Sequence, residues 1–297
     1  MLGEEYYELS SVNIFPPKAQ ASGRVVEPAT LATFDLGEEL VWTATEGGWL
    51  SAFLSPSMER YCCVRAHNQR VVDMRPLAGG GVLSASSDSV RVHGTGGLSL
   101  LSFSDESGDI TCCELEQQFG AILGRASTKL TYFDLHRGVV AGFVDVGCST
   151  SVMKSRGPLL VCGTQNGDVI LRDHRTGLRA EHTLPACAGP VASLDVHSDL
   201  LVSCGWSERQ GQMMYDNLVK VYDIRVGARA LTHIPFQGPA SLQFHPKFSS
   251  TLLVMSNSGV FILTDVQDGG LHAQTYTVTP STMPGVELRM QAAVEAL

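Results

Sequence analysis

A repeat of about forty residues constrains the fold of this chain more than any other feature. Six segments share one pattern: an apolar strand, a turn rich in glycine or serine, a second apolar strand and a closing turn residue. The segments are Leu40–Leu54, Val82–Gly94, Ala121–Asp134, Leu160–Asp173, Leu201–Asp223 and Leu252–Asp265. Their closing residues lie 40, 40, 39, 50 and 42 residues apart. Short strands repeating every 40–45 residues or so are typical of WD-type β-propeller blades.

The residues within each repeat favour the same interpretation. Asn166-Gly167 can supply the positive φ angles of a tight two-residue hairpin, and Gly47-Gly48 can do the same. Runs such as Val219–Tyr222 suit strands that are covered on both faces. A further strand precedes several hairpins, at Val71–Met74, Ser151–Lys154, Val191–Val196 and Ala240–Phe244. We therefore predict an all-β, WD40-type propeller with about six recognisable blades, of three or four strands each, in a six- or seven-bladed ring.

The domain boundaries follow from the extent of the repeat. We assign residues 28–279 to the propeller and leave residues 280–297 as an unassigned tail. Residues 1–27 form an amino-terminal segment, in which Tyr6–Phe15 alternates in apolar character and Pro16-Pro17 begins a linker. Propellers close their ring because an open sheet edge invites aggregation. Tyr6–Phe15 is the candidate for the ring-closing strand.

One long spacing, of 50 residues, comes from an insertion between Trp206 and Asp216 inside a hairpin. The insertion concentrates residue types that are enriched at the centres of protein interfaces. These candidate partner-binding residues are Trp206, Arg209, Met213, Met214 and Tyr215. The alternative is that Trp206 and Tyr215 fold back onto their own blade.

The WD motif itself is degenerate. No Trp-Asp pair occurs, and Phe133-Asp134, Arg172-Asp173 and Tyr222-Asp223 take its place. We predict that the closing aspartates, Asp134, Asp173, Asp223 and Asp265, are structural and accept backbone hydrogen bonds in turns. Three histidines at expected blade ends, His67, His197 and His245, are predicted to bond to turn backbone.

The sequence offers no catalytic, metal-binding or cofactor-binding residues. Asp105-x-Ser107-Gly108-Asp109 lacks the glycine position and the final glutamate of a calcium loop. The net charge of −9 disfavours autonomous nucleic-acid binding, which normally needs a basic surplus. The eight cysteines include no Cys-x-x-Cys and are expected to be reduced core residues. The acidic start Met1–Glu5 and the lack of an apolar run of about 20 residues predict neither a signal peptide nor a membrane span.

Two stretches of the sequence resemble one known family. The first comprises Phe34-Asp35, Glu38–Trp42, Gly47-Gly48, Ser51–Phe53, Pro56 and Arg60-Tyr61. The second comprises Asp199–Gln210, Asp216–Val226, His245–Lys247 and Ser256–Gly259. In order, and over roughly residues 28 to 270, the chain is similar to the amino-terminal WD40 domain of poly(A)-specific ribonuclease catalytic subunits of the poly(A)-nuclease deadenylation complex.

The resemblance implies a non-catalytic scaffold domain of an enzyme that shortens messenger-RNA poly(A) tails. It implies a regulatory, pseudokinase-bearing subunit as partner, poly(A) ribonucleoprotein as an indirect partner, and a location in the cytoplasm, in processing bodies, and also in the nucleus. The family continues with an inactive ubiquitin-hydrolase-like domain and a metal-dependent exonuclease, whose Asp-x-Glu signature is absent here. The family ring has seven blades, whereas this sequence leaves the pattern after about Thr279, which predicts a fragment, a splice form or an incomplete gene model.

Two other functions stay open from the residues alone. A WD-repeat adaptor of another assembly, such as a ubiquitin ligase or a trafficking coat, would share the same repeat. An enzyme built on a propeller would need residues assembled from several blades, which a sequence does not reveal.

Overall fold

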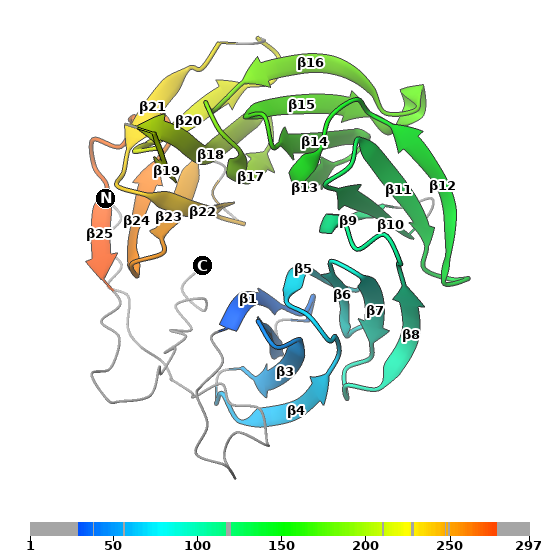
Figure 1. The fold of residues 1–297 in the computed structure, drawn as a ribbon. Helices are drawn as coiled ribbons and strands as arrows, with labels where there is room; N and C mark the ends of the chain where they lie inside the picture. The colour runs from blue at the N-terminus through cyan, green and yellow to red at the C-terminus, as the bar shows by residue number, and fades with distance from the viewer. Residues whose placement is uncertain are drawn as a thin grey trace. The chain divides into compact units, whose positions relative to one another are not determined.

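The computed structural model describes residues 29–37, 39–55, 57–116, 120–209, 211–226, 229–246, 248 and 250–277. The amino-terminal segment 1–27, with the candidate closing strand Tyr6–Phe15, and the tail 280–297 lie outside these residues. Within them the chain forms six antiparallel sheets and one short 3₁₀ helix, His174–Thr176. Figure 1 shows the succession of sheets along the chain.

The chain divides into two compact units. The first consists of Met1–Cys113, Asp134–Val139 and Thr279–Leu297, and the second of Glu114–Phe133 and Val140–Val278. The first unit contains two sheets, with strand orders β1-β2-β3-β4 and β5-β6-β7-β8. Their strands are β1 (Ala29–Phe34), β2 (Leu40–Thr45), β3 (Trp49–Leu54), β4 (Arg60–Arg65), β5 (Val71–Pro76), β6 (Val82–Ser86), β7 (Ser89–His93) and β8 (Ser99–Ser104).

Four further sheets lie mainly or wholly in the second unit, in the orders β12-β11-β10-β9, β13-β14-β15-β16, β17-β18-β20-β21 and β22-β23-β24-β25. The first two consist of β9 (Ile110–Glu116), β10 (Gly120–Arg125), β11 (Lys129–Asp134), β12 (Val139–Asp145), β13 (Thr150–Arg156), β14 (Leu159–Thr164), β15 (Asp168–Asp173) and β16 (Arg179–Pro185). The last two consist of β17 (Val191–His197), β18 (Leu200–Arg209), β19 (Gln212–Tyr215), β20 (Leu218–Asp223), β21 (Thr232–Pro235), β22 (Pro239–Phe244), β23 (Thr251–Ser256), β24 (Val260–Asp265) and β25 (Gln274–Thr277). β19 pairs only with β18, outside the main path of its sheet.

The main path of each sheet thus has four strands in chain order, which is the blade architecture of a β-propeller, and β19 is a fifth strand in one sheet. Every predicted hairpin supplies the two central strands of a sheet, and the predicted additional strands precede them as β5, β13, β17 and β22. The main path has four strands in every sheet because a further strand follows each hairpin. Burial explains why this last strand was harder to recognise: β2 is buried throughout, whereas β12 alternates between exposed and half-buried residues.

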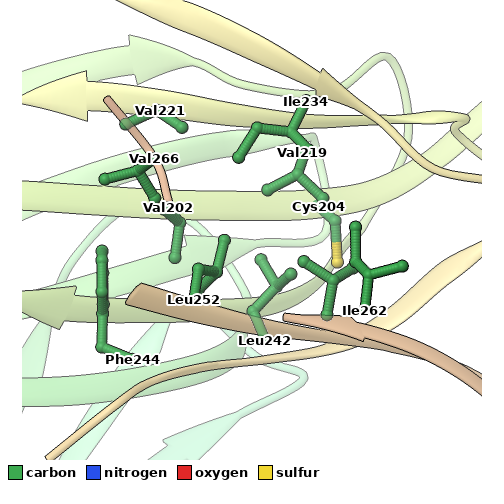
Figure 2. Close-up of a cluster of buried hydrophobic side chains, with 11 residues drawn as sticks. Val202, Cys204, Val219, Val221, Ile234, Leu242, Phe244, Leu252, Ile262 and Val266 are labelled. Atoms are coloured by element: carbon green, nitrogen blue, oxygen red, sulfur yellow. The ribbon is translucent and has the colours of Figure 1, made fainter. Parts of the chain in front are cut away.

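The apolar runs of the central strands are covered on both faces, as their composition predicts. In the second unit, Val202, Val219 and Val221 from β18 and β20 pack against Leu252 and Ile262 from β23 and β24 (Figure 2). The opposite face of the same sheet contributes Leu201 and Tyr222 to a second cluster, with β14 and β15. β18 and β20 therefore each contribute to two cores.

The turns at Asn166-Gly167 and Gly47-Gly48 differ from the predicted two-residue type. Thr164 and Asp168 end the strands of one hairpin, so the turn has three residues, and only Gly167 of the pair Asn166-Gly167 has a positive φ, of 92°. The N–H of Gly167 donates to the carbonyl of Thr164, and the Thr164 hydroxyl accepts the N–H of Asp168. Three-residue hairpin turns commonly end on a left-handed glycine. The turn at Gly48 repeats this arrangement, with φ 80°.

Several first strands of the sheets have a register shift that is not evident from the sequence. A register shift follows the first residue of β1, β5, β13, β17 and β22. After the shift, polar side chains reach the first strand of the next sheet. In the second unit the Ser193 hydroxyl accepts the N–H of Leu242 at 3.1 Å, and the Asp195 carboxylate accepts that of Phe244 at 2.7 Å. Side chains therefore join successive sheets through backbone groups.

Candidate protein-interaction surface

The insertion forms a hairpin that extends one turn of the second unit. β18 continues to Arg209 where the equivalent strand β14 ends at its turn, and β19 folds back along it. Gly211, with φ 76°, lies in the connecting turn. The paired residues are Trp206 with Tyr215, Ser207 with Met214, Glu208 with Met213 and Arg209 with Gln212. Because strand side chains alternate, Trp206, Glu208, Met213 and Tyr215 share one face.

Backbone hydrogen bonds hold the base of the hairpin. The N–H of Trp206 donates to the carbonyl of Pro190 at 2.9 Å, and the carbonyl of Trp206 accepts the N–H of Gly189 at 2.8 Å. The N–H of Asp216 donates to the carbonyl of Gly205, also at 2.9 Å. The terminal methyl group of Met213 occupies the space that a side chain at position 189 would need. The hairpin is therefore seated on the loop that precedes β17.

Four of the five candidate residues of the insertion separate into two groups. The rings of Trp206 and Tyr215 stack at 4.0 Å between centroids, both half-buried, and the Tyr215 hydroxyl accepts a 3.1 Å hydrogen bond from the Asn257 amide. Met213 and Met214 remain 49% and 51% exposed. The backbone of Arg209 belongs to β18, but its side chain lies outside the described residues. The aromatic pair thus stiffens the hairpin, and the methionines face solvent.

The thiols of Cys187 and Cys204 lie near the base of the hairpin, and burial keeps them protonated. Desolvation raises the pKa of Cys187 to about 11, despite the nearby Lys220, and that of Cys204 to about 12. The Lys220 ammonium donates to the carbonyl of Ala186. All eight cysteines are free, consistent with a reduced chain. Neither buried thiol is a nucleophile near neutral pH, because the thiolate is the reactive form.

The four closing aspartates have one geometry in common. Each carboxylate accepts the backbone N–H two residues further along the chain, at 2.7–2.9 Å. The residues concerned are Asp134, Asp173, Asp223 and Asp265. Hydrogen bonds from Arg225 hold the pKa of Asp223 at about 2, and those from Arg175 lower the pKa of Asp173. These carboxylates are occupied by their own turns.

The three blade-end histidines differ from one another. His245 accepts the backbone N–H of Phe248, as expected for a turn. His67 instead bonds to two hydroxyl groups, those of Ser89 at 2.7 Å and Ser84 at 2.8 Å. The expectation of backbone partners was wrong for His67 because both serines come from the next sheet, 17 and 22 residues later. Burial, the largest cause, lowers the pKa of His67 to about 4. His197 packs its ring against Phe244.

The described part of the chain shows neither a grouping of metal ligands nor a membrane-spanning helix. Among those residues, no three His, Cys, Asp or Glu side chains are grouped so that they could hold a metal ion. In the same residues no helix is long and apolar enough to span a bilayer. The hairpin is thus the candidate interaction surface, since it exposes two methionine side chains and its base is fixed.

Comparison with known structures defines the class of protein. The chain matches the WD40 domain of Neurospora crassa Pan2 with a TM-score of 0.82 and 23% identity, over 95% of this chain and 88% of that one. It also matches the computationally designed Ika8 protein, with a TM-score of 0.62 and 17% identity over 85% of this chain and 77% of that one. The fold is therefore a WD40 β-propeller, as the repeat predicts.

The family follows from sequence comparison. Residues 16–296 match the model of the PAN2 N-terminal family, and the chain belongs to that family. The relative from Schizosaccharomyces pombe, named as the catalytic subunit of the PAN2-PAN3 deadenylation complex, is 33% identical over 78% of this chain and 21% of its own length. Those from human and Emericella nidulans are 29% and 30% identical, over 78% and 96% of this chain and 19% and 24% of their own lengths. The chain thus spans about a fifth to a quarter of these relatives and corresponds to a WD40 domain, which is not itself catalytic.

Proposed function

We propose that this chain is a protein-binding scaffold within a deadenylation complex that acts on messenger-RNA poly(A) tails. One observation carries the proposal: on a member of the PAN2 N-terminal family, the insertion hairpin presents Met213 and Met214 to solvent on a base fixed by the Trp206–Tyr215 stack. Apolar side chains on a fixed hairpin suit an interface because covering them removes apolar surface from water while the backbone needs little further ordering.

The partner that fits is the second, regulatory and pseudokinase-bearing subunit of the complex. The relatives are named as subunits of a PAN2-PAN3 complex, which supports a partner of this kind. Contact with poly(A) ribonucleoprotein is indirect, through proteins, because a net charge of −9 repels phosphate. The site of action is the cytoplasm, including processing bodies, and also the nucleus.

The test is binding of the purified chain to the recombinant second subunit, measured by calorimetry. Met214→Asp places a charge on the exposed hairpin and should weaken binding about tenfold or more, the scale of a truncated interface anchor. Val226→Asp is the matched control, since Val226 is 75% exposed in another turn of the same unit and should leave binding unchanged. If the unaltered chain does not bind the subunit, the proposal fails.

A second measurement addresses catalysis. The purified chain, incubated with labelled poly(A) and magnesium, should release no nucleotides. Divalent ions should leave its melting temperature unchanged in a thermal-shift assay, because the described residues group no metal ligands. Magnesium-dependent trimming by the purified chain would contradict a purely non-catalytic scaffold.

A further inference from the structure

The outer edge of β19 is open in the part of the chain that the structure describes, where its pairing is with β18 alone. The N–H and carbonyl of Trp206 bond to Pro190 and Gly189 and so face away from β19. In an antiparallel ladder, opposite residues form their ladder bonds together or not at all. Tyr215, opposite Trp206, therefore directs its N–H and carbonyl away from β18, and Met213, two residues earlier, does the same.

The composition of β19 leaves this edge unprotected. Native sheets block exposed edges with charges, proline or bulges. β16, the outer strand of the preceding sheet, carries Arg179, Glu181 and Pro185, and its register shifts next to Glu181. β19 reads Gln-Met-Met-Tyr, with neither charge nor proline, and pairs in regular register. Its two exposed methionines lie on opposite faces, so an added strand would meet apolar surface on both sides.

The charged residues of the hairpin indicate which charge a bound segment should carry. Glu208, opposite Met213, is exposed, and Asp216 follows the end of β19. Arg209, at the tip, is the one basic residue between Gly205 and Asn217. Lys220 of β20 and Asp216 both lie close enough to Cys187 to shift its pKa, so these two opposite charges lie near one another at the base of the hairpin. The exposed Glu208 carboxylate thus favours a cationic neighbour.

We infer that β19 is a strand-addition site, which binds an extended segment of a partner protein. The backbone of that segment pairs with Met213 and Tyr215, its alternate side chains are aliphatic, and a lysine or arginine lies beside Glu208. The inference rests on the proposed scaffold function and specifies how the partner is held. Strand addition takes affinity from main-chain hydrogen bonds and specificity from alternate side chains.

Proline at position 213 gives a selective test. Met213→Pro removes an N–H that faces the open edge, so the β18–β19 ladder stays intact while an added strand loses a donor. Met213→Thr removes the same side chain and keeps that N–H. With the second subunit as probe, both variants lose the Met213 side chain and should bind more weakly than the unaltered chain, and Met213→Pro should bind about tenfold more weakly than Met213→Thr. Both variants should melt at the same temperature, since the hairpin lies outside the core clusters.

Hydrogen exchange supplies the second readout. In the complex, the amides of Met213 and Tyr215 should exchange more slowly than in the free chain, and Glu208→Lys should weaken binding. Equal binding by both Met213 variants, or equal loss in both, overturns strand addition while the scaffold function stands. If the unaltered chain does not bind the subunit, the proposed function fails and the inference fails with it.

Discussion

At the scale of single residues, the glycine that ends each three-residue turn meets the sharpest steric demand. A Cβ atom at Gly167 would collide with the carbonyl oxygen of Cys187, and φ is 92°. Gly157 also has a positive φ, of 55°, but nothing within 4 Å. We expect Gly167→Ala to lower the free energy of unfolding by about 3 kcal/mol or more, and Gly157→Ala by about 1 kcal/mol. Equal losses in denaturant titrations would show that the turn yields without strain.

Residue-scale predictions from the sequence succeed where the partner is local. The need for glycine at positions 48 and 167 is visible in the chain, because a turn forms within a few residues. The turn length is not visible, since Asn166 keeps a negative φ and only register shows a three-residue loop. The partners of His67 are hidden for another reason: Ser84 and Ser89 reach it from a neighbouring sheet.

At the scale of elements, polar clamps between first strands stabilise the stacking of sheets in the second unit. Asp195→Ala leaves the N–H of Phe244 without its acceptor, and such a loss costs about 1–3 kcal/mol. Gln243 occupies the equivalent position on β22, and its side chain is exposed. We therefore expect Gln243→Ala to change stability by less than about 0.5 kcal/mol. Comparable losses in the two variants, measured by chemical unfolding, would assign the effect to something other than the clamp.

The elements themselves were largely predictable, and the reason is burial. Central strands are apolar on both faces, so each hairpin from Leu40–Leu54 to Leu252–Asp265 is evident in the sequence. Outer strands such as β25, Gln-Thr-Tyr-Thr, are short and polar and give no such signal. The insertion was predictable as a departure from the period. Which of its residues face solvent was not, because that depends on contacts with Gly189 and Asn257.

At the scale of the whole molecule, the period identifies the propeller because each blade repeats one structural problem: burying two faces of a small sheet. The proposed partner-binding hairpin occurs in one repeat only, so the repeat does not predict it. Replacing residues 206–217 by the three-residue turn Gln165–Gly167 should therefore remove binding of the second subunit and leave the melting temperature within about 4 °C, roughly 1 kcal/mol for a domain of this size. A cooperative loss of the fold would show that the insertion is part of the core.

The dependence of stability on pH tests the buried ionisable groups together. His67 has a folded pKa of about 4 against an ordinary value of 6.5, so the unfolded chain binds more protons between these values and stability falls on acidification from pH 6.5 towards 4. The pKa of Cys162 is raised from 9.0 to about 12, so its contribution is complete below pH 9 and is lost as pH rises above it. Stability should therefore be greatest between about pH 6.5 and 9. His67→Gln should be less stable at pH 7 but lose less on acidification, since His67 accounts for about 3 kcal/mol of the acid loss. An acid limb of unchanged steepness in this variant would mean that His67 is charged, or solvated, in the native protein.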